Sequence, residues 1–372
     1  MFHTIITLAY IIPNIYVFLR IWQVFINKGY KLHFTLIYLL LASIYPVSNL
    51  FSEGDTGFPA GILMLTGNYI LPFYLYLFLS VLAFDIFLLV NFLFKIIPAD
   101  KIRSKRFKIT GLSVILFFTV IVVVAGVINF NTIRTSEYSI GIPGKSSEIN
   151  HLKIAFAADF HLKEGTNINF VKRFAKEIAL IKPDLMVFGG DIVEGDREDE
   201  NMTVFEKLFR EINTKYGVYA VLGNHEYYGG LDKGSFFDKA GMTVLCDTIV
   251  VIDSSFNLGG RYDSHFRTRK NIEDFMKSVT DSLPMILIDH RPTEIDAVSK
   301  TAVDVQLSGH THNGQLFPVN LITGRVYELS WGYRKIANTH FFVTSGIQLW
   351  GPPVRTTGKS EIMVIDITFV GR

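Results

Sequence analysis

Nearly continuous apolar sequence fills the first third of the chain, broken only by short polar loops. Arg20 and Asp85 are the only charged side chains within the apolar stretches. A helix needs roughly 20 predominantly apolar residues to cross about 30 Å of hydrocarbon, and every stretch reaches that length. A helix buried in a soluble core is the alternative, which such long and uncharged stretches disfavour. The pattern therefore predicts a transmembrane region over residues 1–133 with four helices, at 2–27, 32–52, 68–94 and 109–133.

The two charges inside the apolar stretches lie at similar depth. Arg20 precedes Lys28 and Asp85 precedes Lys95, so at about 1.5 Å per residue each lies roughly 12–15 Å from the same boundary. Ionisable groups within a bilayer are costly enough that each is expected to have a partner. We therefore expect a structural ion pair between Arg20 and Asp85, in preference to a transport role.

Basic residues are distributed unevenly among the polar loops. The first loop carries Lys28 and Lys31, the second carries Glu53 and Asp55, and the third contains six lysines and arginines between positions 95 and 108. Lys and Arg concentrate in cytoplasmic loops, which places the first and third loops in the cytoplasm. The chain lacks the basic n-region of a cleaved secretory signal, so the helices are expected to be retained. The domain after the last helix is therefore predicted on the extracytoplasmic face of the cell membrane.

The hydrophobic period changes after residue 133. Residues 134–150 contain Ser, Gly, Pro and charged residues, and they are predicted to form a linker and a first strand. Beyond them, short apolar runs end at or just before Gly or Asp, as buried strands do. These runs occupy 153–158, 185–190, 217–223, 284–289 and 303–309, and helical spacing appears between them at 167–181, 200–212 and 271–282. Alternating strands and helices predict an α/β layered domain over residues 151–372.

A polar side chain able to bind a metal follows each predicted strand. In chain order these residues are Asp159 and His161, Asp191, Asn224 and His225, His290, and His310 and His312. Ligands bind open α/β sheets at the carboxyl ends of the strands, so the side chains are expected to meet. Residues two apart on an extended segment project in the same direction, which favours one cluster for each such pair. Gly190, Gly223 and Gly309 permit the close backbone approach that a cluster requires.

The amino-acid composition limits which side chains could bind a metal and which partners are expected. Cys246 is the only cysteine, which excludes a zinc-thiolate site and leaves His, Asp, Glu and Asn as donors. The formal net charge is only +2, whereas a protein that binds nucleic acid duplexes normally carries a concentrated basic stripe. Any metal site is therefore expected to use nitrogen and oxygen ligands, and no nucleic acid partner is expected.

The ordered motifs DFH, GD, GNHE, a single His and GHTH resemble the calcineurin-like metallophosphoesterase superfamily. The segments GHTHNGQ and SGIQLWGPPVR resemble its bacterial branch, which is often membrane-associated and includes phospholipid and lipid A precursor phosphohydrolases. The resemblance covers the chain from about residue 136 to residue 372. It implies a layered α/β sandwich in which two central β-sheets are flanked by helices.

The resemblance also implies a centre with two divalent metal ions, with Mn, Fe or Zn favoured. One ion would be held by Asp159, His161, Asp191 and His312, and the second by Asp191, Asn224, His290 and His310. Two such ions clamp the attacking and leaving oxygens, and a hydroxide shared between them attacks phosphorus. By the same resemblance His225 protonates the leaving alkoxide or stabilises the transition state. Glu226 either orients His225 or is a helix N-terminal acid.

Weaker signals concern the substrate. The loop 259–270 is rich in basic residues, and Arg261 within it is expected to bind phosphate unless the loop is simply solvated. Arg291, next to His290, carries the same expectation, and pairing with a local acid is its alternative. Trp350 is expected either to form an apolar wall of the site or to belong to a structural turn.

These observations predict a membrane-anchored phosphohydrolase, either a phosphodiesterase or a phosphomonoesterase, whose substrate is a lipid-linked phosphate ester. Two alternatives stay open. The same chemistry could act on soluble nucleotides or cyclic phosphodiesters, with the membrane serving only as an address. The other alternative is a non-catalytic binding domain attached to a membrane sensor or transporter, which the complete ligand set disfavours.

Overall fold

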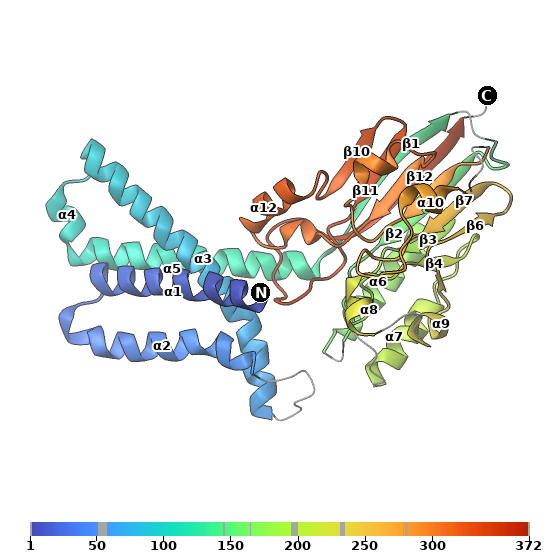
Figure 1. Cartoon of the computed structure of the whole chain (residues 1–372). Coiled ribbons are helices and arrows are strands. Elements are labelled where there is room, and N and C mark those ends of the chain that lie inside the picture. Colours follow the sequence, from blue (N-terminus) through green and yellow to red (C-terminus); the bar gives the residue numbers. More distant parts are fainter. Residues whose placement is uncertain are drawn as a thin grey trace. The chain divides into compact units, whose positions relative to one another are not determined.

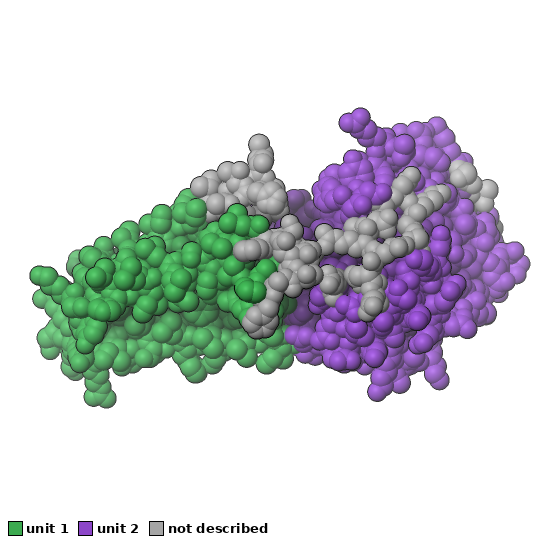
Figure 2. All heavy atoms as spheres, turned by 90° about the horizontal axis from the view of Figure 1, so that it is seen from below, with its two compact units in different colours: residues 1–128, 351–356 green, residues 129–350, 357–372 purple. Residues whose placement is uncertain are grey.

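The computed structural model describes residues 2–50, 58–143, 146–163, 165–194, 200–230, 235–277, 279 and 282–370. The chain divides into two compact units, which are coloured differently in Figure 2. Unit 1 contains Met1–Ile128 and Gly351–Thr356, and unit 2 contains Asn129–Trp350 and Thr357–Arg372. Each unit has hydrophobic clusters of its own.

Unit 1 is built from long apolar helices (Figure 1). They are α1 (Phe2–Val24), α2 (Lys31–Ser48), α3 (Phe58–Phe94) and α5 (Lys105–Asn131), with the short helices η1 (Lys28–Tyr30) and α4 (Ala99–Arg103) in the connections. Among the described residues, three helices are long and apolar enough to cross a membrane, at Lys28–Ser48, Pro59–Phe94 and Lys105–Asn131. Helix α1 packs against α2 and α3, and its Tyr10, Val17 and Ile21 belong to the same hydrophobic cluster as residues of those helices.

Two helix boundaries can be compared with those predicted from the sequence. Helix α3 begins at Phe58, upstream of the start expected at residue 68, and Pro72 lies inside it. Proline is tolerated within apolar membrane helices because neighbouring groups compensate the freed backbone atoms. Residues 51–52, the expected end of the second helix, lie outside the described residues.

Arg20 and Asp85 form the predicted ion pair. Arg20 Nε donates to Asp85 Oδ2 at 2.6 Å, and a terminal nitrogen donates to the other carboxylate oxygen. The Tyr16 hydroxyl donates to the same carboxylate. A bidentate pair of this kind fixes the geometry between α1 and α3 and neutralises both charges.

Unit 2 contains two six-stranded sheets. The first has the order β1 (Ile133–Pro143), β12 (Ser360–Val370), β2 (His151–Ala157), β3 (Leu185–Phe188), β4 (Val218–Ala220) and β5 (Thr243–Val244). The second has the order β10 (Gly332–Ile336), β11 (Thr339–Val343), β9 (Val305–Ser308), β8 (Met285–Ile288), β7 (Phe256–Gly260) and β6 (Thr248–Ile252). Strands β2 to β5 are parallel to one another, and so are β7, β8, β9 and β11. The two central sheets expected from the sequence are confirmed.

Alternating side chains along the strands separate the layers. On β2, Ile154 and Phe156 enter the core between the sheets, whereas Ala155 and Ala157 pack against the helices of the first sheet. The same alternation on β8 separates that core from the helices of the second sheet. The first sheet is covered by α6 (Ile168–Ile181), α7 (Glu200–Arg210) and α9 (Ser235–Lys239), and the second by α10 (Ile272–Met276) and α11 (Ile295–Val298). Helix α10 ends at Met276, before the end predicted at residue 282.

We expect the Arg20–Asp85 pair to stabilise unit 1. Replacing Arg20 with Met leaves the Asp85 carboxylate without its counter-charge, so the protein should unfold at a lower SDS fraction in mixed micelles. The double variant Arg20→Met/Asp85→Leu should recover part of the loss, with a coupling energy of about 0.5–3 kcal/mol. Single-variant losses that simply add in the double variant would contradict an energetic pair.

Candidate metal centre

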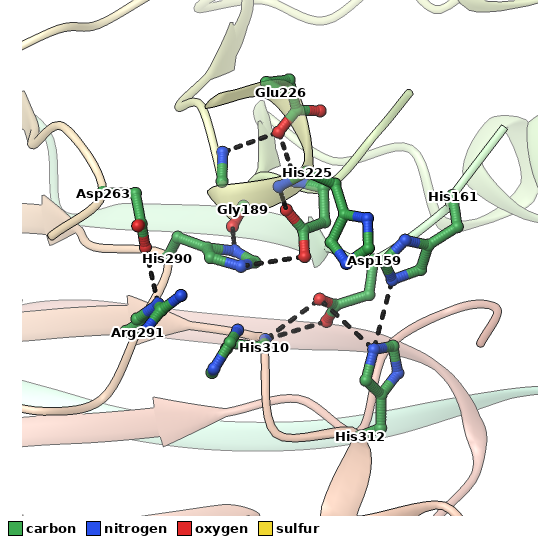
Figure 3. Close-up of polar contacts among 12 residues, drawn as sticks. Asp159, His161, Gly189, His225, Glu226, Asp263, His290, Arg291, His310 and His312 are labelled. Atoms are coloured by element: carbon green, nitrogen blue, oxygen red, sulfur yellow. Dashed lines mark hydrogen bonds and ion pairs between the residues drawn. The ribbon is translucent and has the colours of Figure 1, made fainter. Parts of the chain in front are cut away.

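The polar side chains that follow the strands converge on one site (Figure 3). The first sheet supplies Asp159 and His161 after β2, Asp191 after β3, and Asn224 and His225 at the start of helix α8 (Asn224–Tyr228) after β4. The second sheet supplies His290 after β8, and His310 and His312 after β9, where His312 opens the short helix η2 (His312–Gly314). The carboxyl ends of parallel strands from both sheets therefore face a common centre.

Three overlapping groups of donor atoms lie there, and within each group the atoms are no more than 4.8 Å apart. The groups are Asp159, His161 and His312; Asp191, His290 and His310; and His161, Asp191 and His225. The first two correspond to the two ligand sets expected from the sequence. Asp191 belongs to two of the groups, and its Oδ2 lies 3.1 Å from His290 Nε2. These overlapping groups suit two adjacent cations, and the bridging role of Asp191 that the resemblance implies stays a prediction.

Two further contacts test whether a cation fits. The Nε2 atoms of His161 and His312 lie 3.2 Å apart, a distance at which two imidazole nitrogens need a proton or a cation between them. Asn224 Oδ1 is buried and has no hydrogen-bond partner among the described residues, a deficit of about 1–3 kcal/mol. An oxygen-binding and nitrogen-binding divalent cation satisfies both demands, so the residues fit the implied metals.

Backbone strain is concentrated at the same positions. Positive φ angles between 47° and 69° occur at Asp159, His161, Asp191, His310 and His312. A residue with a side chain in this left-handed region costs about 1–2 kcal/mol, and such residues cluster at functional sites. The N–H groups of Asp159 and His161 donate to the carbonyls of Gly190 and Asp191, both at 3.0 Å, which holds the strained turns in place.

The glycines singled out in the sequence stand where no side chain fits. A Cβ at Gly223 would lie 2.2 Å from Asp191 Oδ1, and a Cβ at Gly309 would lie 2.7 Å from Asp159 Oδ2. Both positions place backbone directly against a ligand carboxylate. The expected close approach of the backbone to the cluster is confirmed at these two glycines.

Buried charges shift the pKa values of the site. Burial raises the pKa of the Asp159 carboxyl to about 6. Burial also opposes charge on His290, but the carboxylates of Asp191 and Asp159 outweigh it and raise the pKa of His290 to about 10. Burial and the positive charge of His290 lower the pKa of His310 to about 3. The carboxylates thus favour a protonated His290 ring beside Asp191, and a bound cation would take over the role of that positive charge.

Glu226 ties the backbone of the site together. Its carboxylate accepts hydrogen bonds from the N–H groups of Asp191, Ile192, Val193 and Gly223, at 2.6–3.1 Å. Glu226 is also the acid in the first turn of α8. Of the two roles left open by the sequence, these contacts favour the helix N-terminal acid.

Glu194 is a site residue that the sequence pattern did not reveal. Its Oε1 lies 2.6 Å from His161 Nδ1, and its Oε2 lies 2.8 Å from His225 Nδ1. Burial opposes charge on this carboxyl, but its hydrogen bonds with both rings outweigh burial and lower the pKa of Glu194 to about 2. One carboxylate therefore fixes both rings, and Nε2 is the nitrogen that each can offer to a metal or a substrate. The acid three positions after Asp191, in GDIVEG, is the signal that could have identified it.

His225 lies toward solvent at the edge of the cluster. Its side chain is 16% exposed, and its ring centroid lies 6.1 Å from that of Trp350 and 5.9 Å from that of Tyr228. Burial acts to lower the pKa of His225, but Glu194 and Asp191 outweigh it and raise that pKa above its ordinary value. Trp350 thus stands beside the site, as the apolar-wall interpretation expects.

Arg291 is held beside the cluster by an acid. Its Nε lies 2.8 Å from Asp263 Oδ2, and a terminal nitrogen lies 2.9 Å from His265 Nδ1. Figure 3 shows Arg291 near His290 and His310, with Asp263 on its far side. The local acid expected as its alternative partner is therefore present, and the guanidinium is still close to the ligands.

Arg261 is not brought to the cluster. Its side chain is fully buried and pairs with Asp289 at 3.0 Å and with Glu294. Arg269 binds the same two carboxylates. The basic loop therefore supports Asp289, the residue before His290, and the phosphate contact expected of Arg261 is replaced by this structural one.

The chain is similar in sequence to a family of phosphoesterases and to several bacterial metallophosphoesterases. A family model described as "Calcineurin-like phosphoesterase" matches residues 152–314, which include every candidate ligand. An "Uncharacterized metallophosphoesterase" of Helicobacter pylori is 33% identical over 223 residues, covering 58% of this chain and 60% of the relative. Another with that name from Aquifex aeolicus is 31% identical over 243 residues, covering 63% of this chain and 92% of the relative. A Campylobacter jejuni metallophosphoesterase is 27% identical over 391 residues, covering 98% of both chains.

We expect Glu194→Gln to weaken metal binding. Gln lacks the charge that fixes the Nδ1 protons of His161 and His225, so metal affinity should fall by about 10–100-fold, as is typical for such supporting groups. Calorimetric titration of the metal-free protein with Mn²⁺ measures the effect. Glu211→Gln changes an exposed glutamate of unit 2 and serves as the control. Equal affinity in the two variants would show that Glu194 does not support the metal site.

Proposed function

The chain belongs to the calcineurin-like metallophosphoesterases, a family of metal-dependent phosphoric ester hydrolases, and on this basis we propose that it cleaves a lipid-linked phosphate ester. The observation that carries the proposal is the convergence of Asp and His donors around Asp191. The same chain contains helices of membrane length and composition. The donors support the reaction class, and the helices support the substrate class.

The chain's own residues would hold two divalent metals, as the family does. Asp159, His161, Asp191 and His312 would hold one ion, and Asp191, Asn224, His290 and His310 the other. Two bound cations supply Lewis acidity toward a phosphoryl group and lower the pKa of water. Nitrogen and oxygen donors without thiolate suit Mn, Fe or Zn.

We assign His225 to the transfer of a proton to the leaving oxygen. Its Nδ1 is bound to Glu194, so Nε2 is the atom that carries the transferable proton. The raised pKa of His225 favours the protonated ring that a general acid requires. Its place toward solvent gives it access to the departing group.

Arg291 is assigned to an oxygen of the phosphate or of the lipid headgroup. Asp263, whose side chain is fully buried, binds Nε and so sets the direction of the whole planar guanidinium. A guanidinium fixed on one edge can present its terminal nitrogens to an anion. The proximity of His290 and His310 puts that anion next to the cluster.

A lipid-linked substrate is supported by the way unit 2 is attached. Helix α5 ends at Asn131 and β1 begins at Ile133, which leaves only Thr132 between helix and sheet. This direct connection to a helix of membrane length and composition supports a substrate at the membrane surface. The uneven distribution of basic residues favours the extracytoplasmic face.

Purified full-length protein should hydrolyse bis-p-nitrophenyl phosphate or p-nitrophenyl phosphate only with an added metal such as Mn²⁺. Asp191→Ala should abolish turnover because both ions lose a ligand, and His225→Ala should lower kcat by about 10²–10⁴-fold. His151→Ala removes an exposed histidine and should leave turnover unchanged. Absence of metal-dependent turnover in folded protein would favour the non-catalytic binding domain.

The substrate class is tested with the same protein in mixed micelles. Phosphate esters of diacyl lipids should give a higher kcat/KM than nucleotides or cyclic phosphodiesters. The reverse order would overturn the lipid assignment and leave the hydrolase assignment intact.

The basic limb of the pH profile should depend on Glu194. If protonated His225 is the acid, turnover falls as pH rises through the pKa of His225. Glu194 holds that pKa up against the opposing effect of burial. Glu194→Gln should therefore move the basic limb of kcat/KM to lower pH, measured at saturating Mn²⁺. A limb that stays in place would argue against His225 as the proton donor.

A further inference from the structure

Helix α12 (Val319–Val326) of unit 2, labelled in Figure 1, has no buried residue. The exposed apolar side chains on it and just before it are Phe317, Val319, Leu321, Ile322 and Val326. Ile322 and Val326 are 64% and 68% exposed. The helix therefore offers apolar surface to its surroundings along its whole length.

A helix of this kind lacks the usual sources of stability in water. Isolated helices shorter than about 12–15 residues are marginal, and most protein helices are stabilised by burying an apolar face. Helix α12 has only eight residues and buries none of them. Contiguous exposed apolar surface of this type marks an interaction site.

Both ends of α12 lie next to turns that carry candidate ligands. The turn before it contains η2, which carries His312, and a Cβ at Gly314 (φ +69°) would lie 2.5 Å from the backbone of Asn320. At the other end, the ring centroid of Tyr327 lies 6.0 Å from that of His310. One end of the helix thus packs on the turn that carries His312, and the other is followed by a residue that contacts the ring of His310.

We propose that α12 inserts into the lipid surface and delivers a lipid-borne phosphate to the metal centre. This inference rests on the proposed function and deepens it by naming the segment that engages the lipid. The partner is a bilayer because only Thr132 separates α5 from strand β1 of unit 2, and α5 is long and apolar enough to cross a membrane. No separate partner is needed to bring lipid to this unit.

Charge around the helix suits a phospholipid surface. Arg325 on α12 is exposed, and each basic residue near an anionic surface contributes about 1 kcal/mol of attraction. The nearby acid Glu328 is paired with Arg334 at 3.7 Å. Apolar side chains beside an exposed basic residue are typical of interfacial helices.

The test places a fluorescent probe on α12 in full-length protein. Cys246 is the only cysteine, so Cys246→Ala provides a background in which Ile322→Cys, or separately Val326→Cys, is labelled with an environment-sensitive dye. The protein is reconstituted in vesicles of phosphatidylcholine and phosphatidylglycerol. Leu180→Cys on α6 is the matched control, because Leu180 is an apolar residue of the same unit with a similar exposure of 65%.

Lipids that carry a doxyl quencher near the headgroup should quench the probes at positions 322 and 326 and leave the probe at position 180 bright. Equal quenching at all three positions, or none at positions 322 and 326, would overturn the proposal. Energy transfer between labelled copies without lipid quenching would show that a second copy covers the helix, which also overturns it. Because this readout needs no turnover, it stands even if the proposed reaction is wrong.

A kinetic experiment tests delivery of the substrate. Ile322→Ser/Val326→Ser should lower kcat/KM for a vesicle-borne phosphate ester by about tenfold or more, since two apolar side chains no longer enter the lipid. Turnover of p-nitrophenyl phosphate should stay unchanged, and Leu180→Ser should alter neither. A parallel loss on both substrates would indicate damage to the metal centre and would contradict a role in lipid capture.

Discussion

The buried carboxylate of Asp191 is the constraint on which the catalytic unit depends. Its residue is 1% exposed, and a charge removed from water so completely must be compensated by neighbours. His290 Nε2 lies 3.1 Å away, and the backbone N–H of His225 donates to Oδ1 at 2.8 Å. These partners come from the ends of different strands in different sheets. The two sheets must therefore meet at this edge, and Gly223 must lack a side chain so that the backbone can pass the carboxylate.

The strained turns show how firmly the sandwich holds that edge. Left-handed backbone at a ligand such as Asp159 or His310 persists only where the surrounding structure determines it. The strands that lead into these turns are buried on both faces, as the fully buried patterns of β3, β8 and β9 show. Glu226 adds four hydrogen bonds to backbone N–H groups across two of the turns. The buried strands and the hydrogen bonds to Glu226 thus hold the candidate ligands in position.

Sequence alone located the candidate ligands because each is marked by a local pattern. An apolar run, a glycine and then a donor, as at Asp191 and His310, record both a strand end and a close backbone approach. Roles that depend on distant partners have no such mark. Glu194 acquires its role from His161 and His225, which lie on other turns, and Arg261 is buried by an acid that follows another strand. A basic residue in a loop looks the same in sequence whether it faces solvent or an internal carboxylate.

The predicted start of α3 and the predicted end of α10 were wrong for a related physical reason. The apolar spacing after Met276 continues although the helix stops, and Pro72 does not end α3 because a proline is tolerated within an apolar helix. The spacing of residues records which face is buried, whereas the length of a helix depends on what packs against it. Such lengths follow from tertiary contacts that a single sequence does not display.

Two features of unit 2 support the proposed class of substrate. Asn224 Oδ1 is a buried polar atom without a partner among the described residues, and α12 is apolar surface without cover. The first demand is met by a cation and the second by hydrocarbon. Tyr327, which follows α12, has its ring centroid 6.0 Å from that of His310, and the turn before α12 carries His312, so α12 lies beside two turns that carry candidate ligands. The proposed substrate, with an anionic phosphate at one end and an acyl chain at the other, would satisfy both demands, which a soluble nucleotide would not.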